Sequence, residues 1–391
     1  MNYQVNSSRI LKLLTVGILI GSLTSCSNQD AGTTKSQSAS YVEPAIGKSG
    51  GFVYRYVGNK QERLDIAGQW AASDVRSDGE FDPIRVAAYK SIQSLPKDND
   101  YKNFLFEYLF QPSFPGEIEN VIKLQAIEFA QKFSKQLNKP ITVKIVGITE
   151  KNGDYIANEL PSIIPQESFG NSLEILEDYV SLERFYRRGG TGGGSAWFSF
   201  PKNYGYYLAH TSSLATTDTY WPEVVPHEMS HVLTGYLTAD SGGNRFPEGD
   251  PKSKINGHFI EGSANTLGMA AGFQTLGWYS DEMDRLLARD IAYFKDWKPL
   301  TTVDDAVKFI EFIERRDTEV NAQFSYSAGQ VVWEYFIGKY GAPKFFEFLG
   351  NMRITPNFNE NLKKTIGIDR ISFYRDAGEY LMKTSQRLSQ K

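Results

Sequence analysis

Two segments of the sequence decide the fold: Pro226-His-Glu-Met-Ser-His231 and, further along, Phe259-Ile-Glu-Gly-Ser-Ala-Asn265. The first segment contains the pattern H-E-x-x-H. Residues four apart lie one turn apart on the same face of a helix, so His227 and His231 can direct two imidazole nitrogens at one ion. Glu228 is rotated aside, where it reaches a water bound to that ion. The spacing therefore predicts a metal-binding helix over 223–237.

The third metal ligand has to come from elsewhere in the chain. A catalytic zinc ion usually has three protein ligands and one open position. The continuation H-x-x-G-x-x-H is not met, because Thr234 and Leu237 stand where it requires glycine and histidine. Glu261 follows His231 with 29 residues between them, which leaves room for a loop and an antiparallel second helix. We therefore expect Glu261 to be the third ligand.

Histidine is scarce in this chain, which strengthens the prediction. The four histidines are His210, His227, His231 and His258. The alternative to a metal site is that His227 and His231 are ordinary histidines whose ring nitrogens are hydrogen-bonded on a helix face. Because histidines are so few in this chain, the alternative explains their spacing poorly. His258 lies three residues before Glu261, so it is a rival third ligand or a substrate contact. A structural role is favoured for it, as it is for His210 at the end of a predicted strand.

H-E-x-x-H followed by E-G-x-A on the next helix resembles the gluzincin group of zinc metallopeptidases. The resemblance covers about residues 189–381 and implies that His227, His231 and Glu261 bind one zinc ion and that Glu228 is the catalytic base. It also implies that Asn265 orients a ligand histidine, as outer-shell residues do. A plain helix-surface amide is an equally good interpretation of Asn265.

A looser resemblance lies downstream. Tyr326-Ser-Ala-Gly-Gln and the residues that follow, up to Tyr340-Gly341, resemble the late helix of small gluzincins. Several gluzincins use a tyrosine or histidine as a donor to the oxyanion, which makes Tyr326 a candidate. An ordinary packed tyrosine is the alternative.

These residues predict a zinc-dependent peptidase that acts on a peptide or protein substrate. Zinc lowers the pKa of its bound water from about 15.7 to about 7, and Glu228 would accept the proton as attack begins. One alternative is a zinc amidase acting on cell-wall peptides. Another is a non-catalytic metal-binding lipoprotein, although a purely structural site needs no base such as Glu228. A third assigns substrate capture to residues 51–188.

The start of the chain predicts export. Arg9 and Lys12 accompany an apolar run over 13–23, shorter than the about 20 apolar residues that span a bilayer. A basic start, a short apolar core and small residues describe a signal peptide over 1–25. The run closes on Leu23-Thr24-Ser25-Cys26, which resembles the lipobox of bacterial lipoproteins and implies acylation of Cys26.

Cys26 is the only cysteine, which excludes an internal disulfide and a thiolate metal cluster. A plain cleaved signal with a chance cysteine is the alternative to a lipid anchor. Ser27 is not aspartate, and by resemblance to the sorting rule of two-membrane bacteria this favours the outer membrane. The rule does not apply to a host with a single membrane. Residues 26–50 lack a periodic apolar face and are expected to form a flexible tether from the membrane anchor.

Composition narrows the possible partners. Hydrophobic residues make up 41% and aromatic residues 14% of the 391 residues, enough for a substantial core. The formal net charge is −4 and no dense Lys/Arg cluster occurs, so nucleic acid is not an expected partner. The aromatic residues also allow a glycan-binding surface, although such residues more often form core. The oligomeric state has no signal in the sequence.

A glycine-rich segment, Gly189-Gly-Thr-Gly-Gly-Gly194, precedes a predicted hairpin over 195–210. It lacks the Lys-Ser/Thr ending of a phosphate loop. Either it is a mobile loop, or it is a strand edge with which an extended peptide substrate pairs.

The remaining patterns predict an α+β fold. Before 189 the signals are mixed: strands at 51–57 and 141–146, and helices at 83–95, 117–138 and 173–186. After 222 the chain is mostly helical, with segments at 223–237, 258–276, 281–294, 303–315, 326–340, 343–352 and 371–383. We therefore expect a gluzincin-like catalytic domain over 189–391, with a small strand-rich layer followed by a helical half, and a mixed α/β region of unknown role over 51–188.

Overall fold

The computed structural model describes twelve stretches of the chain, separated by gaps. They are residues 54–57, 60–64, 69–71, 74–149, 160–163, 193–199, 203–211, 213, 221–238, 257–294, 297–355 and 357–389. The expected signal peptide, the acylation site Cys26, the tether over 26–50, the helix over 173–186 and most of the segment 189–194 lie outside the described residues.

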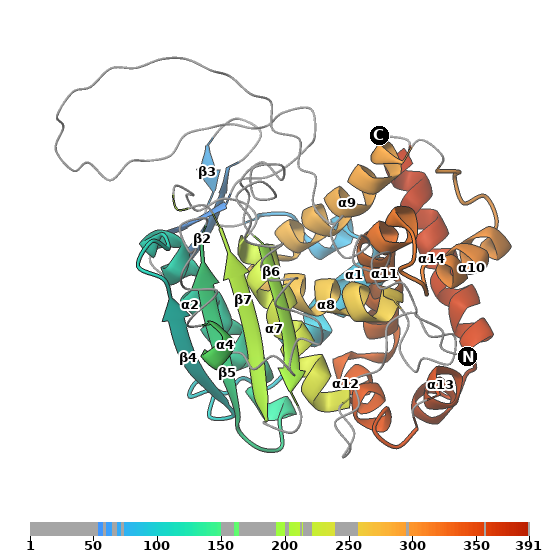
Figure 1. Cartoon of the computed structure of the whole chain (residues 1–391). Coiled ribbons are helices and arrows are strands. Elements are labelled where there is room, and N and C mark those ends of the chain that lie inside the picture. The colour runs from blue at the N-terminus through green and yellow to red at the C-terminus, as the bar shows by residue number, and fades with distance from the viewer. Residues whose placement is uncertain are drawn as a thin grey trace, which may run out of the picture.

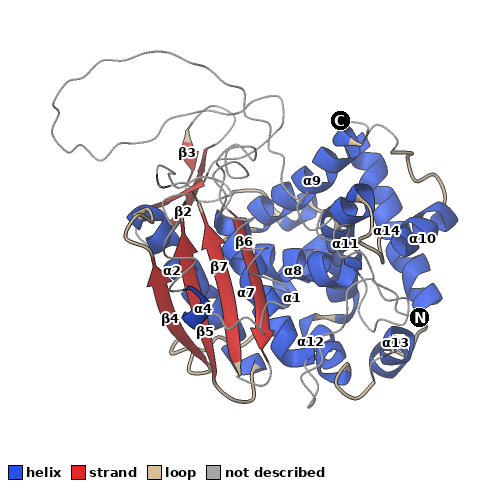
Figure 2. Ribbon diagram, in the orientation of Figure 1, coloured by secondary structure: helices blue, strands red, loops and turns tan. Residues whose placement is uncertain are grey.

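A four-stranded mixed sheet forms one layer of the molecule (Figure 2). Its order is β4 (Phe104–Phe110), β5 (Ile141–Ile148), β7 (Tyr204–His210) and β6 (Gly193–Ser199). β5 runs parallel to both neighbours, whereas β6 and β7 are antiparallel, with Ala196 opposite Tyr207. The predicted hairpin over 195–210 is therefore confirmed, and β6 is the last strand at its end of the described sheet.

The two faces of the sheet bury different residues, because side chains alternate along a strand. In β5, Ile141, Val143 and Ile145 belong to the main hydrophobic core. Val146 and Ile148 point to the other face, where a second small cluster forms with Trp197, Tyr206 and Leu208. The helices α2 (Gly116–Phe133) and α7 (Trp221–Thr238) pack together on the main-core face.

The helix α2 is shorter than the predicted segment 117–138. It gives way after Phe133 to the 3-10 turn η2 (Ser134–Gln136). Just beyond the end of α2, Asn103 Nδ2 donates hydrogen bonds to the carbonyls of Ser134 and Leu137. A side chain from the start of the neighbouring strand thus satisfies carbonyls that a longer helix would have bonded internally.

The second layer is helical, as Figure 1 shows. It contains α8 (Gly257–Gly272), α9 (Leu276–Tyr293), α10 (Val303–Phe312), α11 (Glu319–Tyr340), α12 (Ala342–Asn351), α13 (Phe358–Ile366) and α14 (Arg370–Ser389). Two boundaries differ from the sequence prediction because of caps. Thr275 accepts a hydrogen bond from Trp278 N and begins α9, so α8 ends earlier than predicted. Thr318 caps α11, which therefore begins before Tyr326.

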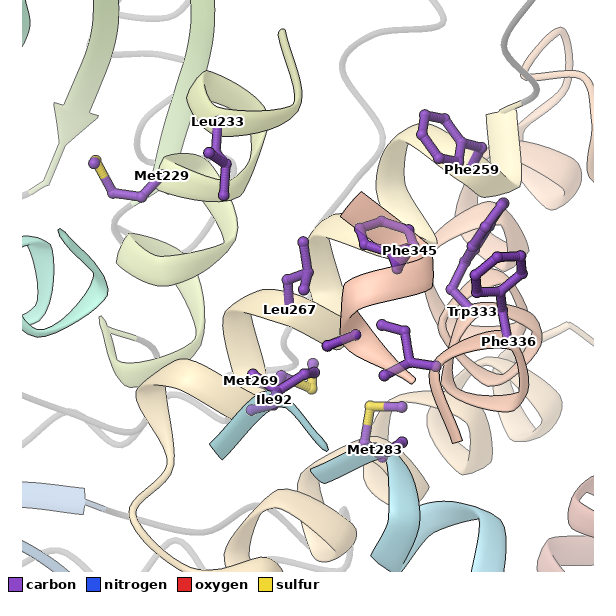
Figure 3. Packing of buried hydrophobic residues seen from close by; sticks show 14 of the residues in the cluster. Ile92, Met229, Leu233, Phe259, Leu267, Met269, Met283, Trp333, Phe336 and Phe345 are labelled. Carbon is purple, nitrogen blue, oxygen red and sulfur yellow. The ribbon is translucent and has the colours of Figure 1, made fainter. Parts of the chain in front are cut away.

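The remaining elements tie the N-terminal region into the same core. They are the small sheet of β1 (Tyr54–Val57), β2 (Lys60–Leu64) and β3 (Trp70–Ala71), the turn η1 (Asp78–Glu80), and the helices α1 (Pro83–Gln93) and α4 (Leu160–Ile163). Ile92 of α1 lies in one cluster with Met269 of α8 and Met283 of α9 (Figure 3). The main sheet and this core thus join residues on both sides of the boundary expected at 188/189.

The α+β class is confirmed by this arrangement of mixed sheet and helices. Among the described residues, no helix combines the length and apolarity needed to cross a bilayer. The patterns do not predict β4 or α13, although the aromatic residues at every second position of Phe104-Leu-Phe-Glu-Tyr-Leu-Phe110 are typical of a strand.

Candidate metal centre

The site lies where α7, α8 and α11 pack against one another. Close approach of these helices requires residues without side chains. A Cβ added at Gly268 of α8 would lie 2.6 Å from the backbone N of His227, and one at Gly262 would lie 2.2 Å from the backbone C of Gly329 in α11. Only glycine allows backbones to approach so closely. α8 is therefore held directly against both neighbouring helices.

Three candidate ligand atoms converge between α7 and α8. His227 Nε2 and His231 Nε2 are 3.0 Å apart, and each is 3.3 Å from Glu261 Oε2. Among the described residues, these three side chains are the group of His, Cys, Asp or Glu residues that could hold a metal ion. Glu261 Oε2 is buried without a hydrogen-bond partner in the part of the chain that the structure describes. Such an atom fits a ligand for a cation.

Asn265 determines which nitrogen of His227 carries the proton. Gln330 Nε2 donates to the Met283 carbonyl at 2.8 Å, which leaves Gln330 Oε1 to accept from Asn265 Nδ2 at 3.2 Å. Asn265 Oδ1 then faces His227 Nδ1 at 2.6 Å and is only an acceptor there. Nδ1 therefore carries the hydrogen, and Nε2 of a neutral His227 presents a lone pair to the site.

Glu261 is a buried carboxylate held in its charged form. Burial alone would raise its pKa, but the Arg316 guanidinium and the two imidazoles hold the pKa well below its usual range. Arg316 Nη1 donates to Oε1, the carboxylate oxygen that does not face the histidines. One oxygen of Glu261 is thus neutralised by a cation and the other is directed at His227 and His231.

Glu228, next to His227 on α7, lies against β6 of the sheet. A Cβ at Gly194 of β6 would meet its Cγ at 2.8 Å, and the Ala196 backbone N–H donates to its carboxylate. Burial raises the pKa of Glu228 to about 7; interaction with the His227 side chain opposes this rise, and the negative charge of Glu261 adds to it. A carboxyl group with a pKa near neutrality is suited to accept and return a proton.

Tyr326 of α11 also borders this centre. Its ring stacks on the imidazole of His227, with centroids 5.9 Å apart and an interplanar angle of 20°. Its hydroxyl accepts a hydrogen bond from Arg316 Nη2 at 3.3 Å. The structure therefore brings Tyr326 next to the three candidate ligands, with its hydroxyl held by the same guanidinium that binds Glu261.

The other two histidines lie elsewhere. His258 is fully buried, and its Nδ1 accepts from Trp333 Nε1 at 3.2 Å while its Nε2 meets the Tyr374 hydroxyl at 2.9 Å. Burial lowers the pKa of His258 to about 3, with Arg370 acting in the same direction. Both ring nitrogens are thus engaged in the core. His210 ends β7 opposite Gly193, and by strand alternation it points to the face away from α7.

Sequence reasoning missed Arg316 and Gln330. Arg316 stands in a turn between α10 and α11, where no periodicity singles it out. Gln330 follows Tyr326 by four residues and so shares its helix face, which was an available signal. No protein-family model matches this chain, and no curated protein or solved structure matches it. The chemistry assigned to the centre therefore rests on the residues of this chain alone.

Proposed function

We propose that this chain is a zinc-dependent peptidase of the gluzincin type, with His227, His231 and Glu261 as metal ligands and Glu228 as general base. The observation that carries the proposal is the convergence of two imidazole Nε2 atoms and one carboxylate oxygen within 3.3 Å. Lone pairs and a negative charge repel one another at this distance unless a metal ion or a proton lies among them, and a metal ion can bind all three atoms at once. Two histidines and one glutamate are the ligand set of many catalytic zinc sites.

Zinc bound there would supply an activated water and would polarise the scissile carbonyl. Glu228 accepts the proton of the attacking water on its carboxylate and passes it to the leaving amine. Its burial between α7 and β6 supports this role, because burial brings its pKa close to neutrality. Tyr326 is the candidate donor to the developing oxyanion, since its ring stacks on His227 at the border of the centre.

A peptide is the favoured substrate because of β6. This strand is the last at its end of the described sheet, and its Gly194 and Ala196 contact Glu228. An extended peptide that pairs with the outer edge of β6 would therefore pass beside the base and the metal ligands. This supports the strand-edge interpretation of the glycine-rich segment, which ends at Gly194.

The experiment is cleavage of a peptide library by the chain lacking residues 1–26, with and without a chelator. We expect chelator-sensitive cleavage. Glu228→Gln should retain zinc and lose most turnover, whereas His227→Ala should lose zinc in metal analysis. Glu347→Gln, at an exposed position on α12, is the matched control and should behave as wild type. Unchanged turnover in Glu228→Gln would remove Glu228 from the mechanism.

The same preparation separates the alternatives. Digestion of peptidoglycan without digestion of protein substrates would identify a cell-wall amidase instead. Zinc-loaded protein that cleaves neither would favour a non-catalytic metal-binding role.

A further inference from the structure

The turn that follows α10 is fastened to the first turn of α8. The backbone N–H of Gly257 donates to the Glu314 carbonyl at 2.7 Å, and that of His258 donates to the Ile313 carbonyl at 3.1 Å. The first N–H groups of a helix have no partner inside the helix, so these two bonds satisfy them. Residues 313–316 are thereby fixed beside the turn of α8 that carries Glu261.

Arg316 uses this position to reach the centre. A Cβ at Gly257 would lie 2.7 Å from Arg316 Cγ, so the stem of the arginine lies over a residue that has no side chain. The Arg316 side chain is only 12% exposed. Its guanidinium contacts two groups at once, the Glu261 carboxylate through Nη1 and the Tyr326 hydroxyl through Nη2.

We propose that Arg316 is a positioning residue, which holds Glu261 as a single-oxygen ligand and fixes the Tyr326 hydroxyl relative to it. The inference rests on the proposed function and concerns residues that touch the metal ligands but not the metal. The planar guanidinium has donors at fixed angles, so it can hold two oxygens in one geometry, whereas a lysine ammonium is a point charge. With Oε1 held by Arg316, Glu261 offers Oε2 alone to the ion.

The chain contains a matched control. Arg55 Nε donates to Glu62 Oε2 at 2.7 Å, and the Arg55 guanidinium lies 4.4 Å from the Trp70 ring centroid. These three residues of the small sheet β1–β2–β3 again place an arginine between a glutamate and an aromatic ring, and none of them is a candidate ligand. Arg55→Gln therefore removes a similar interaction away from the proposed ligands.

The first test measures zinc affinity of the full-length chain by competition with a chromophoric chelator. We expect Arg316→Gln to bind zinc about 10–100-fold more weakly than wild type, the usual effect of losing an outer-shell partner. Arg316→Lys should lose less, because an ammonium still neutralises Glu261. Arg55→Gln should bind zinc within about twofold of wild type, because Arg55 contacts neither a candidate ligand nor a residue that positions one. Thermal unfolding of the metal-free proteins shows whether each variant is folded.

The second test is a double-mutant cycle on turnover with Tyr326→Phe. If Arg316 acts through the Tyr326 hydroxyl, Tyr326→Phe should cost little in the Arg316→Gln background. If the losses of turnover in Arg316→Gln and Tyr326→Phe multiply in the double variant, the inference is overturned and the proposed function is not. The same holds if zinc affinity is unchanged in folded Arg316→Gln and Arg316→Lys. Wild-type protein that binds no zinc would instead overturn the proposed function.

Discussion

Asn265 Oδ1 lies 2.6 Å from His227 Nδ1 and is the acceptor in that hydrogen bond. The roles are fixed because Asn265 Nδ2 is already engaged by Gln330 Oε1, and Gln330 is in turn oriented by the Met283 carbonyl. The side-chain amides of Gln330 and Asn265 thus form a hydrogen-bonded series from one backbone carbonyl of α9 to His227, a candidate metal ligand on α7. This series of hydrogen bonds sets the tautomer of His227, with the hydrogen on Nδ1.

Replacement of Asn265 should therefore weaken metal binding. In Asn265→Leu, His227 loses the acceptor that holds its proton on Nδ1, and we expect zinc affinity to fall about 10–100-fold. Competition with a chromophoric chelator measures the change. Asn361→Leu is the control, because Asn361 is another fully buried amide whose partners, the Phe348 carbonyl and Thr365, lie outside the centre. Equal affinities of Asn265→Leu and wild type would show that this series of hydrogen bonds has no role in metal binding.

Removal of the charge of Glu228 should stabilise the metal-free protein. Burial raises the pKa of Glu228 from 4.5 to about 7. A carboxyl group with a folded-state pKa above its unfolded value destabilises the fold once ionised, so the cost is absent below the lower value and complete above the higher one. At about pH 8, Glu228→Gln should have a free energy of unfolding up to about 3 kcal/mol higher than wild type.

Urea unfolding in the presence of a chelator, at about pH 4 and about pH 8, checks this sign. The difference between Glu228→Gln and wild type should shrink at the lower pH. Glu347→Gln, on the exposed surface, should show no such pH dependence. A variant less stable than wild type at the higher pH would contradict the prediction.

A methyl group at residue 268 should separate the two helices that carry the candidate ligands. In Gly268→Ala the new Cβ would lie 2.6 Å from the backbone N and 2.7 Å from the Cα of His227. Backbone atoms cannot rotate away, so α7 and α8 must move apart, at a cost of about 1–3 kcal/mol in free energy of unfolding.

Zinc affinity should fall in the same Gly268→Ala variant, because Glu261 moves with α8 and the histidines with α7. Gly350→Ala is the control: no atom lies within 4 Å of a Cβ added there. Alanine at that helical position should stabilise the protein by up to about 1 kcal/mol. Thermal unfolding and chelator competition on both variants make the comparison, and tight zinc binding by Gly268→Ala would contradict it.

A buried ion pair joins α1 to the helical layer. Arg85 and Glu334 have side chains 3% and 0% exposed, and Glu334 also accepts from the hydroxyls of Tyr279 and Tyr380. Arg85→Met leaves the carboxylate of Glu334 buried without its cation, and we expect a loss of about 3–5 kcal/mol in free energy of unfolding. Urea unfolding measures it. Arg55→Met breaks a partly exposed pair with Glu62 and should cost no more than about 1 kcal/mol.

Much of the helical layer could be predicted from sequence, because apolar residues recur there with a period near 3.6. Apart from α13, which the patterns do not predict, the errors are at the ends of helices. Thr275 and Thr318 begin helices at residues that periodicity does not mark, and Asn103, directly before β4, binds carbonyls just beyond the end of α2. Such boundaries depend on which side chain reaches an unpaired backbone group, and periodicity carries no information about that.

By itself, the sequence determined the helical face shared by His227 and His231, because residues four apart on a helix are neighbours whatever surrounds them. It also gave Glu261 as the nearest carboxylate on a following helix. Only the tertiary structure decided that the Glu261 carboxylate meets both imidazoles, since this depends on the close packing of α8 against α7 at Gly268 and against α11 at Gly262. The same packing decided that Arg316, Asn265 and Gln330 lie around the candidate ligands. Local spacing fixes the direction of a side chain on its own helix, and only packing fixes what lies opposite it.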